Sequence, residues 1–86
     1  MATLYKTTGE KVEISPKNGK RFTLRELQEL VGGFVEYIHL KGQVLIVNED
    51  GRLMDLPVNH GATQLARQFG YDFIVGDAIY CKKGQA

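Results

Sequence analysis

The segment from Phe22 to Gly33 constrains the fold of this chain more than any other. Thr23 and Glu26 have the T-x-x-E spacing of a capping box, in which each side chain accepts a hydrogen bond from the other residue's backbone N–H. Gly32-Gly33 then ends the helix, because glycine enters the left-handed C-cap conformation at little cost. A helix of about eight residues does not persist alone in water, so its apolar stripe must pack on a sheet. The stripe consists of Leu24, Leu27, Leu30 and Val31.

Short extended runs before and after this helix predict the strands of that sheet. Residues 3–7 and 11–14 alternate in polarity and form a hairpin through Gly9. Residues 34–40 form the next strand. Residues 44–47 are the most apolar and most β-branched run, and we expect them to form the central strand.

The second half of the chain continues with two more strands and a second helix. Asp50-Gly51 is a strong hairpin signal and predicts a return strand over residues 52–56. The helix is expected over residues 60–69, between an Asn59 N-cap and a Gly70 C-cap. Residues 71–81 form the last strand, with a bulge or turn at Gly76-Asp77.

These elements predict one α+β domain with the order ββαβββαβ. Tight turns between consecutive strands make the sheet mostly antiparallel, and the two short helices pack on it. The domain covers residues 1–86, of which residues 1–21 form a basic N-terminal hairpin. We expect residues 82–86 to be a frayed tail.

Composition excludes several classes of protein. The chain has 86 residues and a formal net charge of +1. Its core is thin, which favours a homodimer. Its single cysteine, Cys81, excludes an intramolecular disulfide and a cysteine-cluster metal site, and we expect a half-buried structural thiol. No apolar run reaches the ~18 residues of a membrane span, and the first residues lack the apolar core of a signal peptide, so we expect a cytoplasmic protein that does not contact membranes.

The sequence contains no catalytic or cofactor-binding motif of the common nucleotide, hydrolase, metalloprotease or calcium types. We therefore expect no enzyme activity, no cofactor and no metal. His39 and His60 lie on different elements, and nothing in the sequence brings them together as metal ligands. An active site would require Glu49, Asp55, His60 and Asp77 to converge.

Basic residues gather near the N-terminus, whereas the remainder of the chain is acidic. The loop over residues 17–21 contains a glycine that would let backbone N–H groups approach a phosphate. The candidates for anion or nucleic-acid contacts are Lys17, Lys20, Arg21 and Arg25. A solvated hairpin loop is the alternative, because nucleic-acid-binding domains are usually basic as a whole.

Two polar turns supply the candidates for contacts with a ligand or a partner. Asn48 and Glu49 lie at the expected hairpin tip, where acidic residues form a solvated turn or hold Mg²⁺. Asn59, His60 and Gly61 lie at the start of the second helix. Asn59 is either an N-cap or a polar group that orients an anionic ligand with the free N–H groups of the helix.

Four blocks of the sequence resemble domain-of-unknown-function family 3846. They are residues 27–36 (LQELVGGFVE), 47–53 (VNEDGRL), 56–59 (LPVN) and 74–78 (IVGDA), in the family's order and spacing. Members of this family are frequent in phage, prophage and conjugative-element genomes and have no settled activity. The resemblance implies a mobile-element accessory protein and transfers no catalytic residues. Asn48, Glu49 and Asn59 are polar positions that recur in the motif.

These observations lead to three functional hypotheses. The first is a non-enzymatic accessory protein that binds a host or phage protein and so counters host defence. The second is a small-ligand protein that binds or sequesters a nucleotide or nucleotide signal, held between subunits by N–H groups near Asn59 and Gly32. The third is nucleic-acid binding through the basic N-terminal loop.

Overall fold

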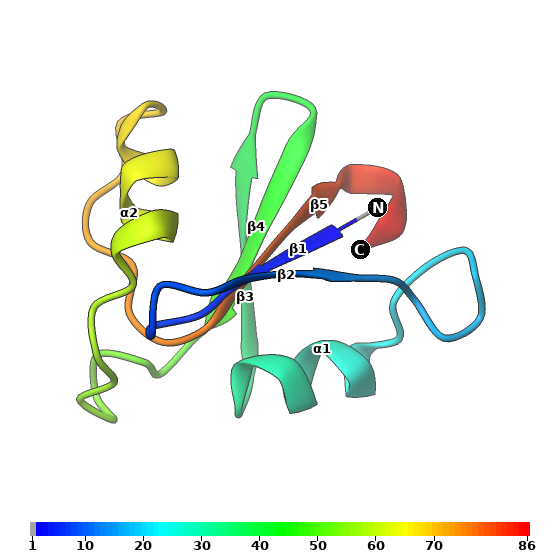
Figure 1. Ribbon diagram of the computed structural model, residues 1–86, viewed down its shortest axis with the longest axis horizontal. Helices are drawn as coiled ribbons and strands as arrows, with labels where there is room; N and C mark the ends of the chain where they lie inside the picture. The colour runs from blue at the N-terminus through cyan, green and yellow to red at the C-terminus, as the bar shows by residue number, and fades with distance from the viewer. Residues whose placement is uncertain (1) are drawn as a thin grey trace.

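The computed structural model describes residues 2–86, which form a five-stranded antiparallel sheet with two helices (Figure 1). The elements are β1 (Ala2–Tyr5), β2 (Lys11–Ile14), α1 (Leu24–Val31), β3 (Val35–Leu40), β4 (Gln43–Asn48), α2 (His60–Arg67), β5 (Ala78–Lys82) and the 3₁₀ turn η1 (Lys83–Gln85). The strand order is β2-β1-β5-β4-β3. The expected α+β class, the antiparallel sheet and the two short helices are confirmed.

The two helices cover opposite faces of the sheet, with α1 below the strands and α2 at the left in Figure 1. Alternate residues of a strand point to opposite faces, so each interior strand contributes to two cores. The α1 core includes Leu27, Val31, Val44, Ile46, Ile79 and Cys81, and the α2 core includes Leu45, Val47, Ala62, Ala66, Ile74 and Ala78. Within residues 2–86, neither helix is long and apolar enough to cross a membrane.

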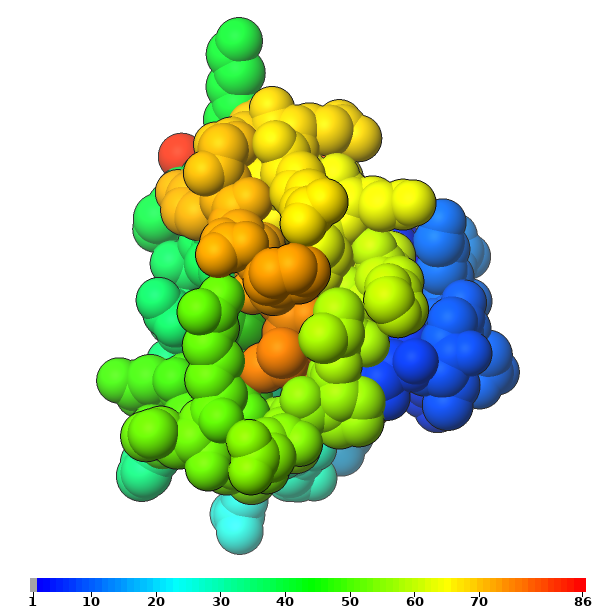
Figure 2. Space-filling view, turned by 90° about the vertical axis from the view of Figure 1, so that its left-hand side faces the viewer, coloured from blue at the N-terminus to red at the C-terminus, as the bar shows by residue number. Residues whose placement is uncertain are grey.

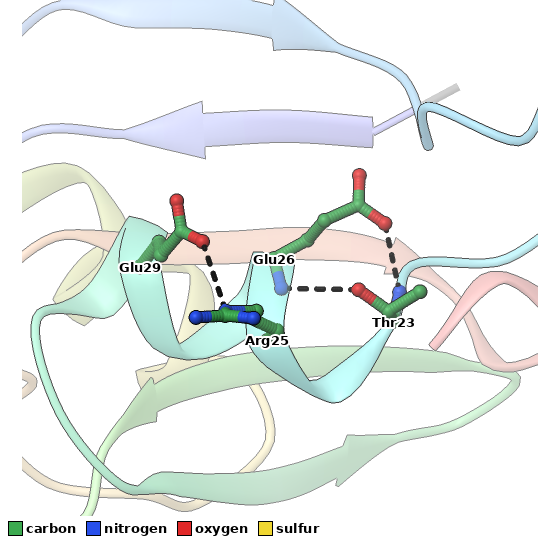
Figure 3. Close-up of polar contacts among 4 residues, drawn as sticks. All are labelled: Thr23, Arg25, Glu26 and Glu29. Atoms are coloured by element: carbon green, nitrogen blue, oxygen red, sulfur yellow. Dashed lines mark hydrogen bonds and ion pairs between the residues drawn. The ribbon is translucent and has the colours of Figure 1, made fainter.

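Helix α1 has the predicted boundaries and caps (Figure 3). The Thr23 hydroxyl oxygen accepts the Glu26 N–H at 3.2 Å, and Glu26 Oε1 accepts the Thr23 N–H at 2.9 Å. Glu26 Oε2 accepts the Lys17 N–H at 3.0 Å. The backbone N–H groups of Thr23 and Lys17 favour the carboxylate and so lower the pKa of Glu26. Gly32 is the C-cap, with φ of 81°.

The return strand expected over residues 52–56 does not form, and this prediction is wrong. Consecutive turns replace it: Asn48 Oδ1 accepts the Asp50 N–H at 2.8 Å, and the Leu56 N–H donates to the Gly51 carbonyl at 3.0 Å. Asp55 adopts φ of 53°, which no strand allows. These local bonds use the backbone groups that a hairpin ladder would need.

The last strand is shorter than expected and begins only at Ala78. Residues 71–77 stay outside the sheet because Ile74 bonds elsewhere: Thr63 Oγ1 accepts its N–H at 3.0 Å, and its carbonyl accepts the Asn59 N–H at 2.8 Å. Strand β5 occupies the centre of the sheet, so the prediction that residues 44–47 form the central strand is wrong. Strand β4 is apolar because both helices cover it.

Three smaller predictions need correction. Helix α2 ends at Arg67 with Gln68 as its C-cap, and Gly70, with φ of 86°, lies beyond it. The C-terminal residues form η1, whose Gln85 carbonyl accepts the Phe22 N–H at 2.8 Å, in place of a frayed tail. Cys81 is 2% exposed rather than half-buried, and this burial raises the pKa of its thiol.

Candidate functional site

Asn59 is fully buried and joins three parts of the fold. Its Oδ1 accepts the Ala62 N–H at 3.1 Å, which confirms the predicted N-cap of α2. Its Nδ2 donates to the carbonyl oxygens of Tyr5 at 2.7 Å and Gly76 at 2.9 Å. Both amide hydrogens and the amide oxygen are therefore used within the protein.

Asn48 has a similar role at the end of β4, where it is 5% exposed. Its Nδ2 donates to the carbonyl of Val31, the last residue of α1, at 3.1 Å, and its Oδ1 begins the turn at Asp50. A Cβ on Gly33 would lie 3.0 Å from this Nδ2, so glycine allows the chain to pass closely. Asn48 thus ties the end of α1 to the first turn after β4.

The two polar turns do not meet in one site. Asn48 and Glu49 line a cleft beside β3, whereas His60 is exposed on the first turn of α2. Gly61 packs against β1, because a Cβ there would lie 2.9 Å from Cδ1 of Tyr5. Among these five candidates, Glu49 combines exposure with a place at a cavity.

That cleft has a volume of about 330 Å³ and lies between β3 and the segment over residues 71–75. Ile38, Val47 and Ile74 line it and also belong to the α2 core, so its inner surface is apolar. Figure 2 shows this end of the molecule, where the orange segment lies between the yellow helix α2 and the yellow-green turns. We call this cavity the β3 cleft.

Large exposed apolar side chains gather around the β3 cleft. Leu53 is 85% exposed and Phe73 is 49% exposed, and both line it together with Tyr71. Val58 and Phe73 line an adjoining hollow. A single exposed apolar residue is ordinary, but a contiguous patch indicates an interaction surface. We call Leu53, Val58, Tyr71 and Phe73 the apolar rim.

Two residues of the apolar rim, Tyr71 and Phe73, make polar contacts that favour one position. Arg52 Nη2 donates to the Phe73 carbonyl at 2.9 Å, and the Arg67 guanidinium lies 5.1 Å from the centroid of the Phe73 ring. The Tyr71 hydroxyl donates to the carbonyl of His39 at 3.5 Å. A surface that is already ordered loses less entropy when it binds a partner.

The β3 cleft is acidic. Glu36, Glu49 and Asp72 line it beside one base, Arg52, which already bonds the Phe73 carbonyl. In the part of the chain that the structure describes, the only ion pair joins Arg25 and Glu29, so these three carboxylates lack a cationic partner. The cleft therefore favours positively charged groups.

The basic candidates lie near the start of α1, at the opposite end of the molecule from the turns and α2 (Figure 1). Lys17, Lys20, Arg21 and Arg25 are all exposed. Asn18 Oδ1 accepts the N–H groups of Lys20 at 2.9 Å and Arg21 at 3.0 Å, so the loop is closed by its own asparagine.

Two of these basic side chains already have partners within the protein, one through a hydrogen bond and one through an ion pair. Arg21 Nη2 donates to the Ala86 carbonyl at 2.7 Å, and Arg25 Nε lies 3.9 Å from Glu29 Oε1 (Figure 3). Lys17 borders a hollow that Glu26 and Glu29 also line. Carboxylates beside the loop reduce its attraction for an anion.

The acidic residues considered for catalysis are dispersed. Glu49, Asp55 and Asp77 line three different hollows, and Asp77 Oδ1 accepts the Thr7 N–H at 3.0 Å. His39 lies on β3 and His60 on α2. Across residues 2–86, no three His, Cys, Asp or Glu side chains gather where they could hold a metal ion.

The fold and the β3 cleft define a small antiparallel α+β module whose two buried asparagines brace an exposed apolar and acidic surface. Residues 1–86 match the model of a family described as a domain of unknown function (DUF3846), and the chain belongs to this family. No curated protein and no solved structure matches the chain.

Proposed function

We propose that this chain is a non-enzymatic accessory protein that binds another protein through the apolar rim and the β3 cleft. The observation that carries the proposal is the concentration of exposed apolar side chains at this one end, with Leu53 the most exposed. Aromatic anchors surrounded by polar groups dominate the energetics of protein interfaces.

The family supplies the second part of the proposal. The resemblance to this family implies an origin in phage or mobile-element genomes. We therefore infer that the partner is a host or phage protein and that binding it counters host defence. An accessory protein of this kind acts by occupying a surface of its target, which requires no catalytic group.

A nucleotide is the alternative occupant, and the charge of the cleft argues against it. Glu36, Glu49 and Asp72 would repel phosphate groups, and Arg52 is the single base among the described residues that line the cleft. The helix N-terminus considered for anion binding is capped by Asn59, whose amide is fully used. The proposal therefore favours a protein partner.

Site-specific photo-cross-linking tests the proposal in cells that naturally carry the gene. A photoreactive side chain replaces Leu53 in one variant and Leu24 in the control, because Leu24 is also an exposed leucine, at 55%, but lies on α1. We expect a discrete covalent adduct with one protein at position 53 and none at position 24. Identical adducts at both positions, or no adduct at position 53, would contradict the proposal.

A further inference from the structure

Strand β3 forms one edge of the sheet, and its outer backbone groups can be assigned from the register. Lys41 and Gly42 both have positive φ, 40° and 86°, as in a two-residue type I′ hairpin. The pair that closes such a hairpin, Leu40 with Gln43, exchanges both backbone hydrogen bonds, and such pairs then alternate along the ladder. Even-numbered residues of β3 therefore bond to β4, and odd-numbered residues face outwards.

Two contacts support this assignment. The Phe34 carbonyl accepts the Glu49 N–H at 2.8 Å, so an even-numbered residue just before β3 bonds towards the β4 side. The His39 carbonyl accepts the Tyr71 hydroxyl, so an odd-numbered residue presents its carbonyl away from β4. Val35 and Tyr37 then carry outward N–H and C=O groups on this edge, and the His39 N–H faces outwards as well.

The β3 cleft lies directly beside these groups. Glu36 and Ile38 of β3 contribute to its wall, and Tyr71 and Phe73 stand on its other side. A strand added to β3 would direct every second side chain to the face that carries the cleft. Backbone pairing would supply affinity, and the cleft would select the side chains.

We propose that the partner binds as an extended segment that pairs with the outer edge of β3 and places apolar and basic side chains in the β3 cleft. This inference rests on the proposed function and specifies its binding mode. The apolar inner surface accepts aliphatic side chains, and Glu36, Glu49 and Asp72 accept lysine or arginine.

Charge and shape favour such a segment over a second copy of the chain. Two β3 edges paired around a twofold axis through Tyr37 would place the two clefts on the same face of one continuous sheet. That arrangement would bring two sets of unpaired carboxylates together and would direct the two overhanging 71–75 segments towards each other. A basic extended segment neither adds carboxylates to the cleft nor brings a second 71–75 segment against the first.

The test uses peptides that are twice the length of β3 and are selected from a random display library for binding to the wild-type protein. Tyr37→Pro removes the outward N–H without removing a bond to β4, and proline is tolerated at sheet edges. Tyr37→Ala is the matched control, because it removes the ring but keeps the N–H. We expect selected peptides to combine alternating apolar residues with Lys or Arg. They should bind Tyr37→Pro about tenfold more weakly than Tyr37→Ala.

Amide hydrogen exchange on the wild-type protein gives a second readout that needs no variant. Peptide binding should slow exchange at Val35 and Tyr37 about tenfold or more and leave the N–H groups bonded to β4 unchanged. Equal affinity for the two Tyr37 variants, or no added protection at these two residues, would overturn the edge pairing while leaving cross-linking at position 53 intact. Failure of the library to yield a binder would also overturn the edge pairing. So would sedimentation showing that the wild-type protein is a homodimer and that Tyr37→Pro is a monomer.

Discussion

The two helical layers of this molecule are built in different ways. The α1 layer is organised by local signals: its capping box, its apolar stripe and its C-cap lie within residues 23–32. The α2 layer is organised by contacts between distant segments, above all the Asn59 amide, which reaches β1, α2 and Gly76. The first layer packs Leu27 and Val31 on its face of the sheet, whereas the second leaves the β3 cleft and its apolar rim exposed.

This difference indicates how a short chain keeps an exposed apolar surface ordered. The turns after β4 and the segment over residues 71–75 contain little regular structure, so their positions depend on a few buried polar groups. Asn48, Asn59 and Thr63 supply those groups. Asn48, Asn59 and Thr63 thus support the candidate interface from beneath.

The largest expected effect comes from Asn59→Ala. The variant removes the N-cap and leaves the carbonyls of Tyr5 and Gly76 without their partner, so we expect a loss of roughly 3–5 kcal/mol in the free energy of unfolding. Asn18→Ala is the control, since Asn18 closes an exposed loop, and should cost less than about 1 kcal/mol. Urea denaturation measures both. Similar losses in the free energy of unfolding for Asn59→Ala and Asn18→Ala would contradict the claim that the α2 layer depends on Asn59.

Gly61→Ala should have the next largest effect. Alanine is a better helix former by about 1 kcal/mol, but its Cβ would lie 2.9 Å from the Tyr5 ring, and overpacking costs about 1–3 kcal/mol. We expect a net loss of up to about 2 kcal/mol from these opposing terms. In a Tyr5→Ala background the sign should reverse, and a double-mutant cycle by thermal denaturation measures the change. A loss that persists without the ring would refute this explanation.

Thr23→Ala tests the locally organised layer. Loss of the N-cap hydroxyl should cost about 1 kcal/mol. Thr8→Ala is the control, because Thr8 accepts only one long bond, 3.4 Å from the Glu10 N–H, and we expect a change within about 0.5 kcal/mol. Chemical denaturation of the pair compares them. If Thr23→Ala lowered the free energy of unfolding as much as Asn59→Ala, the local cap would be as important as the long-range contacts of Asn59, and the distinction between the two layers would be wrong.

The smallest effect is a pH dependence at Glu26. Its pKa in the folded state lies below the unfolded value of about 4.5, so its stabilising contribution is present above that value and is lost as pH falls through the folded pKa. Wild-type protein should therefore lose its stability advantage over Glu26→Gln below pH of about 4.5. Thermal unfolding across acidic pH measures this difference.

The sequence predicts what local chemistry determines. The T-x-x-E spacing, the Gly32 C-cap and the Asn59 N-cap are all confirmed, because each depends on residues within a few positions. The last strand is shorter than predicted because of distant partners: Thr63 and Asn59 hold Ile74 out of the sheet, and no short-range pattern encodes those contacts. The return strand is missing for a local reason, because the Asn48 side chain folds the Asp50-Gly51 segment into turns, and the Asp-Gly pair alone does not distinguish such turns from a hairpin.

The same limit applies to the candidate site. Leu53, Tyr71 and Phe73 lie in segments that the sequence assigns to strands, where apolar residues are expected to be buried. Their exposure follows from turns that bring residues 52–53 beside residues 71–75. The sequence predicts Glu49 as a contact residue, but the surface around it depends on the tertiary fold.

The central claim is that the apolar rim, and not the α1 layer, is the binding surface. The most direct test is the affinity of the cross-linked partner, once purified, for wild-type protein, Leu53→Ser and the control Leu24→Ser. We predict that Leu53→Ser weakens binding about tenfold or more while its unfolding midpoint matches that of wild type, and that Leu24→Ser binds normally. Unchanged affinity for Leu53→Ser, or equal losses in both variants, would contradict the account.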